Sequence, residues 1–319
     1  VLDGMRYTCD PLADAVAAAI NRARPSQMID EVYARARSEG GVFADYVDHC
    51  HTIPAWVDWQ QIEHAARVSL AFNNVRAISL LVSSLVEGYS LSKATHVLVA
   101  TGRLQQDVLR RVYETSQMTH NMTAPGGLRP GGAGHRTIME VRLLHAMVRK
   151  YLRAQGWDTG KYDEPINQED MAFTIIEFDY LAQRGMERMG ASLSPDDQQA
   201  MHHLWRFAAR QNGVCEAMLT DSLGEEIYQY QRIRERQYNP NQESRALARA
   251  ASTRPMPRST SRCTFSTTTM ASSTRMPMEK ISANSDTRLS VKPQAQEANS
   301  VAVSVRTWTL PLSSLSRSL

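Results

Sequence analysis

The sequence predicts an all-α protein, and three observations support this class. Over residues 1–250, apolar side chains recur every three or four positions, which is the period of an amphipathic helix. Residue types that cap helices stand at the starts of these segments. No run shows the strict alternation of a half-buried strand. Both helical signals stop near residue 250, so the sequence predicts a helical domain over residues 1–250 and a separate segment over residues 251–319.

Start and stop signals for individual helices follow one another along this domain. Asp10 and Pro11 have the types of an N-cap and a first helical residue, and a capping pattern begins at Ser194. Gly190 marks the end of the helix before it. The expected helical segments are residues 10–23, about two helices within 57–90, then 91–122, 136–152, 165–190 and 192–214. The glycine-rich segment 123–135 is expected to be the loop before the helix at 136–152.

The composition of the last segment differs from that of the domain. Residues 251–319 hold 25 Ser or Thr, with nine Lys or Arg against three Asp or Glu, a net charge of +6. The whole chain carries +3, which leaves −3 for residues 1–250, so no nucleic-acid partner is expected for the domain. The segment has no helical or strand period and too little apolar surface to offset its ordering entropy. We interpret it as disordered or frame-shifted, with a basic interaction tail as the functional alternative.

Apolar runs and cysteines limit the kind of protein further. The longest nearly apolar run, residues 77–86, has half of the roughly twenty residues that a membrane-spanning helix needs. No transmembrane segment is expected. The compartment stays open: cytoplasmic, or secreted if a signal was lost ahead of Val1. The cysteines form no CxxC pair, and the stretch DHCHT at residues 48–52 is interpreted as a surface turn in preference to a metal site.

One histidine stands at the centre of an apolar helical stripe. At about 100° per residue, Ile138, Val141, His145, Val148 and Leu152 share one face of the helix at 136–152. Arginines flank this histidine one turn before and one turn after, at Arg142 and Arg149. A buried imidazole must satisfy both ring nitrogens. The stripe alone is compatible with a core histidine or with a ligand.

The preceding helix also places polar residues inside an apolar stripe. Arg111 and Thr115 lie on the face defined by Leu104, Val108 and Met118. A buried arginine is costly unless an anion meets its charge.

Two anions can meet the charge of Arg111. The first is a protein carboxylate, Glu177 or Asp179. The second is an acidic group of a bound cofactor, with His145 as a metal ligand and Arg142 or Arg149 sharing the neutralisation. Haem has one axial position for an imidazole and two propionates for the cations.

Other chemistries have little support in the sequence. No ExxH pair is present, which weighs against a carboxylate-bridged di-iron bundle. The glycines of PGGLRPGGAGH form neither GxGxxG nor GxxxxGK, and no GxSxG occurs. We therefore interpret the glycine-rich loop as a surface connection.

Several ordered motifs resemble one known family. The segments LRRVYETSQM, APGGLRPGGAGHR, EVRLLHAMVR, WDTGKYDEPINQEDMAFT and MHHLWRFAAR occur in this order. Together with DPLADAV, IPAWVDW, LVATGRL and SRALARA, they resemble the catalytic domain of the MpaB and rubber-oxygenase (latex-clearing protein) family over about residues 9–250. The resemblance implies a globin-like helical core with additional helices that binds haem b. It also implies an oxygenase that attacks carbon–carbon double bonds of isoprenoid chains.

The resemblance assigns roles to particular residues. His145 matches the proximal ligand of the haem iron, and Arg111 and Thr115 match an Arg-x-x-x-Thr pair beside the haem. Dioxygen is expected to bind opposite His145. Glu114 stands where rubber-cleaving members have a lysine, so Glu114 and Thr115 are the catalytic candidates, and rubber itself is not implied as the substrate. A smaller departure is Asp179 after Phe178, where the family usually has serine.

These observations lead to one main functional hypothesis and two alternatives. The main hypothesis is a haem b-dependent oxygenase that acts with dioxygen on an apolar, unsaturated, isoprenoid-like substrate. The first alternative is a haem protein without oxygenase activity, such as a gas sensor or a peroxidase-like protein. The second is a cofactor-free helical interaction module in which Arg111 and His145 pair with carboxylates.

Overall fold

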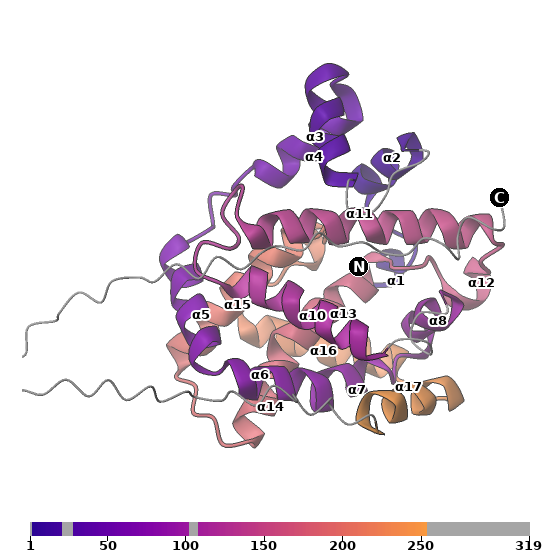
Figure 1. Ribbon diagram of the computed structural model, residues 1–319. Coiled ribbons are helices and arrows are strands. Elements are labelled where there is room, and N and C mark those ends of the chain that lie inside the picture. The colour runs from indigo at the N-terminus through magenta and orange to yellow at the C-terminus, as the bar shows by residue number, and fades with distance from the viewer. Residues whose placement is uncertain (1, 21–27, 102–107, 254–319) are drawn as a thin grey trace, which may run out of the picture. The chain divides into compact units, whose positions relative to one another are not determined.

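A computed structural model describes residues 2–20, 28–101 and 108–253 (Figure 1). For residues 108–112 and 250–253 it describes the backbone but not the side chains. The expected tail at 251–319 lies outside the described residues, apart from the end of the last helix. Within the described part no strand forms, and the β pairing is limited to an isolated bridge between Leu91 and Tyr238. The all-α prediction is confirmed.

The helices of the described part follow one another with short connections. The first nine elements are α1 (Leu2–Met5), α2 (Pro11–Ala19), α3 (Met28–Ser38), α4 (Gly41–His51), α5 (Trp59–Ala71), α6 (Asn73–Ser79), the π-helical turn η2 (Leu80–Ser84), α7 (Leu85–Gly88) and α8 (Ser92–Ala100). The later ones are α10 (Val108–Thr123), α11 (Ala133–Ala154), α12 (Thr159–Tyr162), α13 (Gln168–Phe178), α14 (Tyr180–Arg188), α15 (Pro195–Gln211), the 3₁₀ turn η3 (Glu216–Met218), α16 (Leu223–Gln237) and α17 (Gln242–Thr253).

Local capping explains where several of these helices begin. The side chain of Asp10 accepts a hydrogen bond from the backbone N–H of Ala13 at the start of α2. Ser194 and Asp197 form a complete capping box at the start of α15. Both starts were expected from residue type, because a capping side chain bonds to a backbone group only two or three positions away. The segment expected as one helix over residues 165–190 is two helices, broken at Asp179.

Helix α11 separates two groups of helices (Figure 1). On one side α2, α3 and α4 pack together and against α11, in a cluster that includes Tyr46, Met139 and Leu143. On the other side lie α5, α10, α13 and α15, whose cluster includes Trp205 and Phe207 of α15. α11 therefore contributes side chains to both clusters.

The glycine-rich loop brings α10 and α11 into close backbone contact. A Cβ atom on Gly134 would lie 2.5 Å from the carbonyl oxygen of Asn121 and 2.7 Å from the Cα of Met122. Gly126 and Gly131 adopt positive φ values of 69° and 82°, which favour glycine. The loop is a connection, as expected, but one that is packed inward, since Leu128 is buried.

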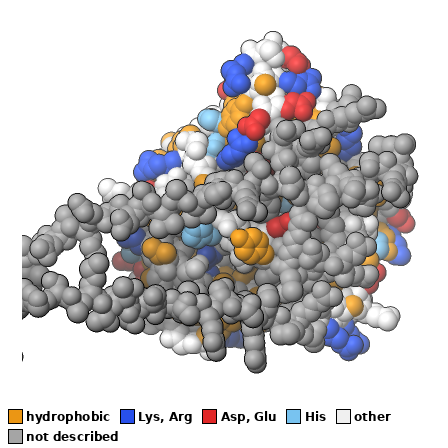
Figure 2. Space-filling model, in the orientation of Figure 1, with side chains coloured by type: hydrophobic (Ala, Val, Ile, Leu, Met, Phe, Trp, Pro, Cys, Tyr) orange, Lys and Arg blue, Asp and Glu red, His pale blue; other side chains and the backbone are white. Residues whose placement is uncertain are grey.

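The stretch DHCHT is not the surface turn expected from the sequence. Residues 48–51 form the last turn of α4, and Cys50 is fully buried. Charged side chains of both signs lie side by side over the α3 and α4 region (Figure 2), including the ion pair between Arg35 and Glu39.

Among the described residues, no single helix has the length and apolar character to cross a membrane. One bent pair, α5 with residues 73–88, meets the length and composition criteria together, with an angle of 84° between its parts.

Candidate functional site

His145 lies on a half-buried face of α11. Ile138 and Leu152 at the two ends of its stripe are buried, whereas Val141, His145 and Val148 remain partly exposed. The more completely buried face of α11 is rotated from this stripe and faces α2 and α4. The apolar stripe expected from the sequence is thus only in part the packed face of the helix.

Arg142 is held by a protein carboxylate on the packed face. Its Nε and Nη2 atoms donate to the two oxygens of Asp10 at 2.5 and 2.9 Å, and both side chains are almost fully buried. The Nη1 atom lies 3.0 Å from Nδ1 of His49. Burial alone would lower the pKa of Arg142, but the hydrogen bond and charge of Asp10 outweigh it and raise that pKa. Arg142 therefore pairs with Asp10 in place of the cofactor carboxylate expected for it.

Arg149 also has its charge met by α2. Its Nε donates to Asp14 at 2.7 Å and its Nη1 donates to the carbonyl of Ile166 at 3.2 Å, while Nη2 is buried without a hydrogen-bond partner. The Arg149 side chain is 0% exposed. The ion-pair partner of Arg149 in the described part of the chain is thus a carboxylate of α2. The sequence could not foresee this pairing, because Asp14 is more than 130 positions away along the chain.

The register of α10 against α11 sets the levels of the remaining site residues along the two helices. Asn121 contacts the backbone near Gly134 and donates to the Thr137 hydroxyl at 3.0 Å, which aligns the two helices at this end. An α-helix rises about 1.5 Å per residue. Residue 111 on α10 and His145 on α11 therefore both lie about 15 Å along their helices from this contact. The loop joins the two helices, which pack against each other (Figure 1). The backbone position of Arg111 is thus level with His145; its side chain lies outside what the structure describes.

Glu114 and Thr115 lie between this level and the loop. Both side chains are half-buried on α10. The Thr115 carbonyl accepts a hydrogen bond from the Thr119 hydroxyl at 2.6 Å, within the same helix. Of the expected site residues, the structure therefore brings Arg111, Glu114, Thr115 and His145 to neighbouring levels of two packed helices.

The two carboxylates considered as partners for Arg111 have other environments. Asp179 pairs with His202, at 3.0 Å between Oδ2 and Nδ1. Glu177 is buried and forms no ion pair among the described residues. Burial, and then the nearby charge of Glu87, raise the pKa of Glu177 well above its usual value.

Arg76 is a buried cation that the sequence analysis missed. It lies on α6 and is 5% exposed, and its Nη2 donates to the Thr123 hydroxyl of α10 at 3.3 Å. The Nε atom is buried without a hydrogen-bond partner, and no carboxylate in the described part of the chain forms an ion pair with this side chain. Burial lowers the pKa of Arg76 to about 10. Its signal in the sequence is a lone arginine just before the longest apolar run, residues 77–86.

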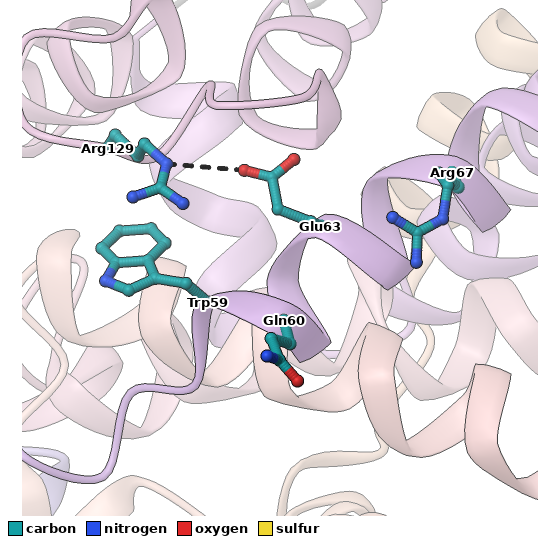
Figure 3. A pocket seen from close by; sticks show the side chains of 5 residues that line it. All are labelled: Trp59, Gln60, Glu63, Arg67 and Arg129. Carbon is teal, nitrogen blue, oxygen red and sulfur yellow. Dashed lines mark ion pairs between the residues drawn. The ribbon is translucent and has the colours of Figure 1, made fainter.

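A surface pocket at α5 does not involve the residues above. Its volume is about 370 Å³, and it is lined by Trp59, Gln60, Glu63, Arg67 and Arg129 (Figure 3). The guanidinium of Arg129, from the glycine-rich loop, lies over the indole of Trp59 at 4.5 Å. Its Nε is 3.5 Å from Oε1 of Glu63. The charged lining and the position at the loop distinguish this pocket from an apolar substrate site.

Comparisons with known proteins assign this helical chain to a family of oxygenases. The family described as ER-bound oxygenase mpaB/B′/rubber oxygenase, catalytic domain, matches residues 64–283. The chain belongs to this family, so the family predicted from the sequence motifs is confirmed. The matched range starts later than the resemblance at residues 9–250 and extends past the expected domain end.

A solved structure supports the fold. The chain is similar to the structure of latex clearing protein LCP in the closed state, with a TM-score of 0.63 and 19% sequence identity. The similarity covers 77% of this chain and 69% of that chain. At this identity the comparison establishes the fold alone. No curated protein matches the chain.

Proposed function

We propose that this chain is a haem b-dependent oxygenase that cleaves carbon–carbon double bonds of an apolar, isoprenoid-like substrate with dioxygen. Membership of an oxygenase family and similarity to the structure of latex clearing protein support the reaction class. The single observation that carries the proposal is the register of α10 against α11. It supports the proposal because the backbone of position 111 in the Arg-x-x-x-Thr pair is level with His145 along the two helices.

The described residues fit a haem group in two respects. The face around His145 presents partly exposed apolar side chains, Val141 and Val148, next to an imidazole, and a haem group would need an apolar surface and a nitrogen ligand of this kind. In addition, Arg76 is a buried guanidinium with an orphaned Nε and no carboxylate partner in the described part. A buried charge of this kind is costly unless an anion lies against it, and a haem propionate is such an anion.

In this proposal His145 and the arginines have different roles in binding haem. His145 would provide a nitrogen ligand to the iron, and Arg111 would neutralise a propionate, with Arg76 as a second candidate cation. Arg142 and Arg149 have no such role in the proposal, because Asp10 and Asp14 already meet their charges. Bound haem b would supply the iron that reacts with dioxygen.

Glu114 and Thr115 are the proposed catalytic residues on α10. The Thr115 hydroxyl can donate a hydrogen bond toward the reacting oxygen, and the Glu114 carboxylate can accept or release a proton beside it. A lysine at this position could act only as a donor when charged. We therefore expect proton transfer near the iron to depend on Glu114 in this chain.

The absorption spectrum of the purified full-length protein tests the cofactor. The proposal expects a Soret band and close to one haem per chain. His145→Ala should remove most of the haem while the helical circular dichroism stays largely unchanged. His120→Ala, an exposed histidine on α10, is the matched control and should retain haem. A His145→Ala variant with full haem content and an unchanged spectrum contradicts the ligand assignment.

Product analysis tests the reaction. With dioxygen and squalene, an unsaturated isoprenoid chain, the protein should form carbonyl products in which each cleaved double bond yields two C=O groups. The saturated analogue squalane should yield none. Haem binding without any such product would favour the sensor or peroxidase-like alternative, and a protein without haem would favour the interaction module.

Arg111→Leu tests the propionate assignment. Removing one partner of a buried charge pair typically costs roughly 3–5 kcal/mol. Haem affinity should therefore fall at least about a hundredfold, since each 1.4 kcal/mol is about tenfold. The apoprotein should keep its stability, and Arg110→Leu, one position away, should have little effect. An unstable apoprotein with normal haem affinity would remove Arg111 from the site.

A further inference from the structure

Three side chains from separate segments meet in the interior of the protein. Asp179 stands at the break between α13 and α14, His202 is on α15 and Glu226 is on α16. Nδ1 of His202 lies 3.0 Å from Oδ2 of Asp179 and 3.5 Å from Oε2 of Glu226. The three residues are 0%, 1% and 2% exposed, respectively. They form a compact donor set of one nitrogen and two carboxylate oxygens.

Supporting contacts orient this set. Nε2 of His202 lies 3.1 Å from the carbonyl of Thr220, and because a carbonyl only accepts, Nε2 carries the hydrogen. Nδ1 is thereby the ring nitrogen that faces both carboxylates. The other oxygen of Asp179 accepts from the Gln183 amide at 2.6 Å. Metal-ligating histidines and carboxylates are commonly held by outer contacts of this kind.

Among the described residues, the two carboxylates of this set face His202 and not a lysine or an arginine. In the described part of the chain, no lysine or arginine forms an ion pair with Asp179 or Glu226. Oε2 of Glu226 and Oε1 of Gln183 are buried without hydrogen-bond partners. A buried carboxylate oxygen in this state is costly unless a positive charge lies against it.

The spacing of the donor atoms fits a single metal ion. Ligand atoms at roughly 2.0–2.2 Å from one ion, with angles near 90–110°, lie about 3.0–3.5 Å apart. The two distances from His202 fall within this range, and all three donor atoms lie within 4.8 Å of one another. We propose that Asp179, His202 and Glu226 bind one divalent transition-metal ion of the zinc type.

The position of the site points to a structural role. The ion would link the α13–α14 break, α15 and α16, which follow one another over nearly fifty positions of the chain. Because the donors are buried, the ion would be taken up as these helices assemble, and its binding energy would add to the stability of the folded state. This site is independent of the proposed haem site, and neither proposal depends on the other.

Protons compete with a metal ion for the same cluster. Against burial, the neighbouring carboxylates of Asp179 and Glu226 raise the pKa of His202 to about 10. Burial, and then the charge of Asp179, raise the pKa of Glu226 to about 8. A protonated imidazole beside a carboxyl–carboxylate pair would then take the place of the metal.

A measurement of zinc binding to the full-length protein distinguishes a cluster that binds a metal ion from one that binds protons. The protein is stripped with a chelator, dialysed and titrated with Zn²⁺ alone, with zinc content measured by mass spectrometry and affinity by calorimetry. Zinc is counted separately from iron, so haem content does not affect the result. We expect one Zn²⁺ per chain with a dissociation constant below about 1 μM, and an increase in Tm on zinc addition.

Near-isosteric variants make the test specific. Asp179→Asn and Glu226→Gln keep the size and hydrogen-bonding capacity of the side chains and should weaken zinc binding at least about a hundredfold. His203→Gln is the matched control, because His203 accepts from the backbone N–H of Asp58 and is not a ligand. The proposal is overturned if wild-type protein binds no stoichiometric zinc, or if the two ligand variants bind it as tightly as wild type does.

Discussion

The two sides of α11 differ in how the charges of buried polar residues are compensated. Toward α2 and α4, Arg142 and Arg149 are paired with Asp10 and Asp14, and the charges balance within the protein. On the side with α10, His145 lies on a half-buried apolar face, and Arg76 reaches α10 with no carboxylate partner in the described part. We infer that the first side holds the fold together and that the second is arranged for a ligand.

Arg142→Leu should have the largest effect on stability. It leaves the buried Asp10 carboxylate unpaired, which typically costs roughly 3–5 kcal/mol. Chemical denaturation of the haem-free protein, followed by circular dichroism, measures the loss. Arg153→Leu is the control on the same helix, because its ion pairs are partly exposed and should contribute about 1 kcal/mol or less. Equal losses in the two variants would show that Arg142 is not a structural residue.

Gly134→Ala tests the register on the α10 side. The new Cβ would overlap the backbone of Asn121 and Met122, so α10 and α11 must move apart. Overpacking of this kind costs roughly 1–3 kcal/mol, and we expect weaker haem binding along with the lower Tm. Gly4→Ala places a Cβ in open space and serves as control. A variant with unchanged Tm and haem affinity would contradict the close approach of the two helices.

Arg76→Met sharpens the contrast between paired and unpaired arginines. Replacing a buried charge that has no protein partner should leave the apoprotein as stable as before or more stable. If a propionate is its partner, haem affinity should fall about tenfold or more, measured by titration with haem. Arg67→Met, an exposed arginine on α5, should change neither quantity. A marked loss of apoprotein stability would place Arg76 among the structural arginines.

The smallest expected effect is a pH dependence at His49. Burial, and then the charges of Arg142 and Arg210, lower the pKa of His49 to about 4 from 6.5. The folded state therefore binds this proton less readily than the unfolded state. The contribution of neutral His49 to the free energy of unfolding is fully present above pH 6.5 and is lost as the pH falls from 6.5 toward 4.

Denaturation curves across this pH window measure that effect. Replacing the histidine in His49→Gln keeps an acceptor near Arg142 and removes the titrating group. The variant should show a flatter decline in stability between pH 6.5 and 4 than the wild type. Identical declines in both proteins would exclude His49 as a source of acid sensitivity.

The sequence by itself determined the features that depend on neighbours along the chain. Caps at Asp10 and Ser194 act within three positions, and the helical period placed Arg111 and His145 on apolar stripes without knowledge of their partners. The ordered motifs also identified the family. Each of these signals is local, since helix geometry repeats every 3.6 residues whatever lies across from it.

Tertiary packing alone decided which charges meet. Arg142 and Asp10 are 132 positions apart, and only the packing of α2 on α11 made them a pair. The same holds for Asp179, His202 and Glu226, which lie on three segments and share no motif, and for Cys50, which the end of α4 buries. A buried charge must find its counter-charge in space, and the sequence pattern records that a partner is needed without recording which residue or ligand provides it.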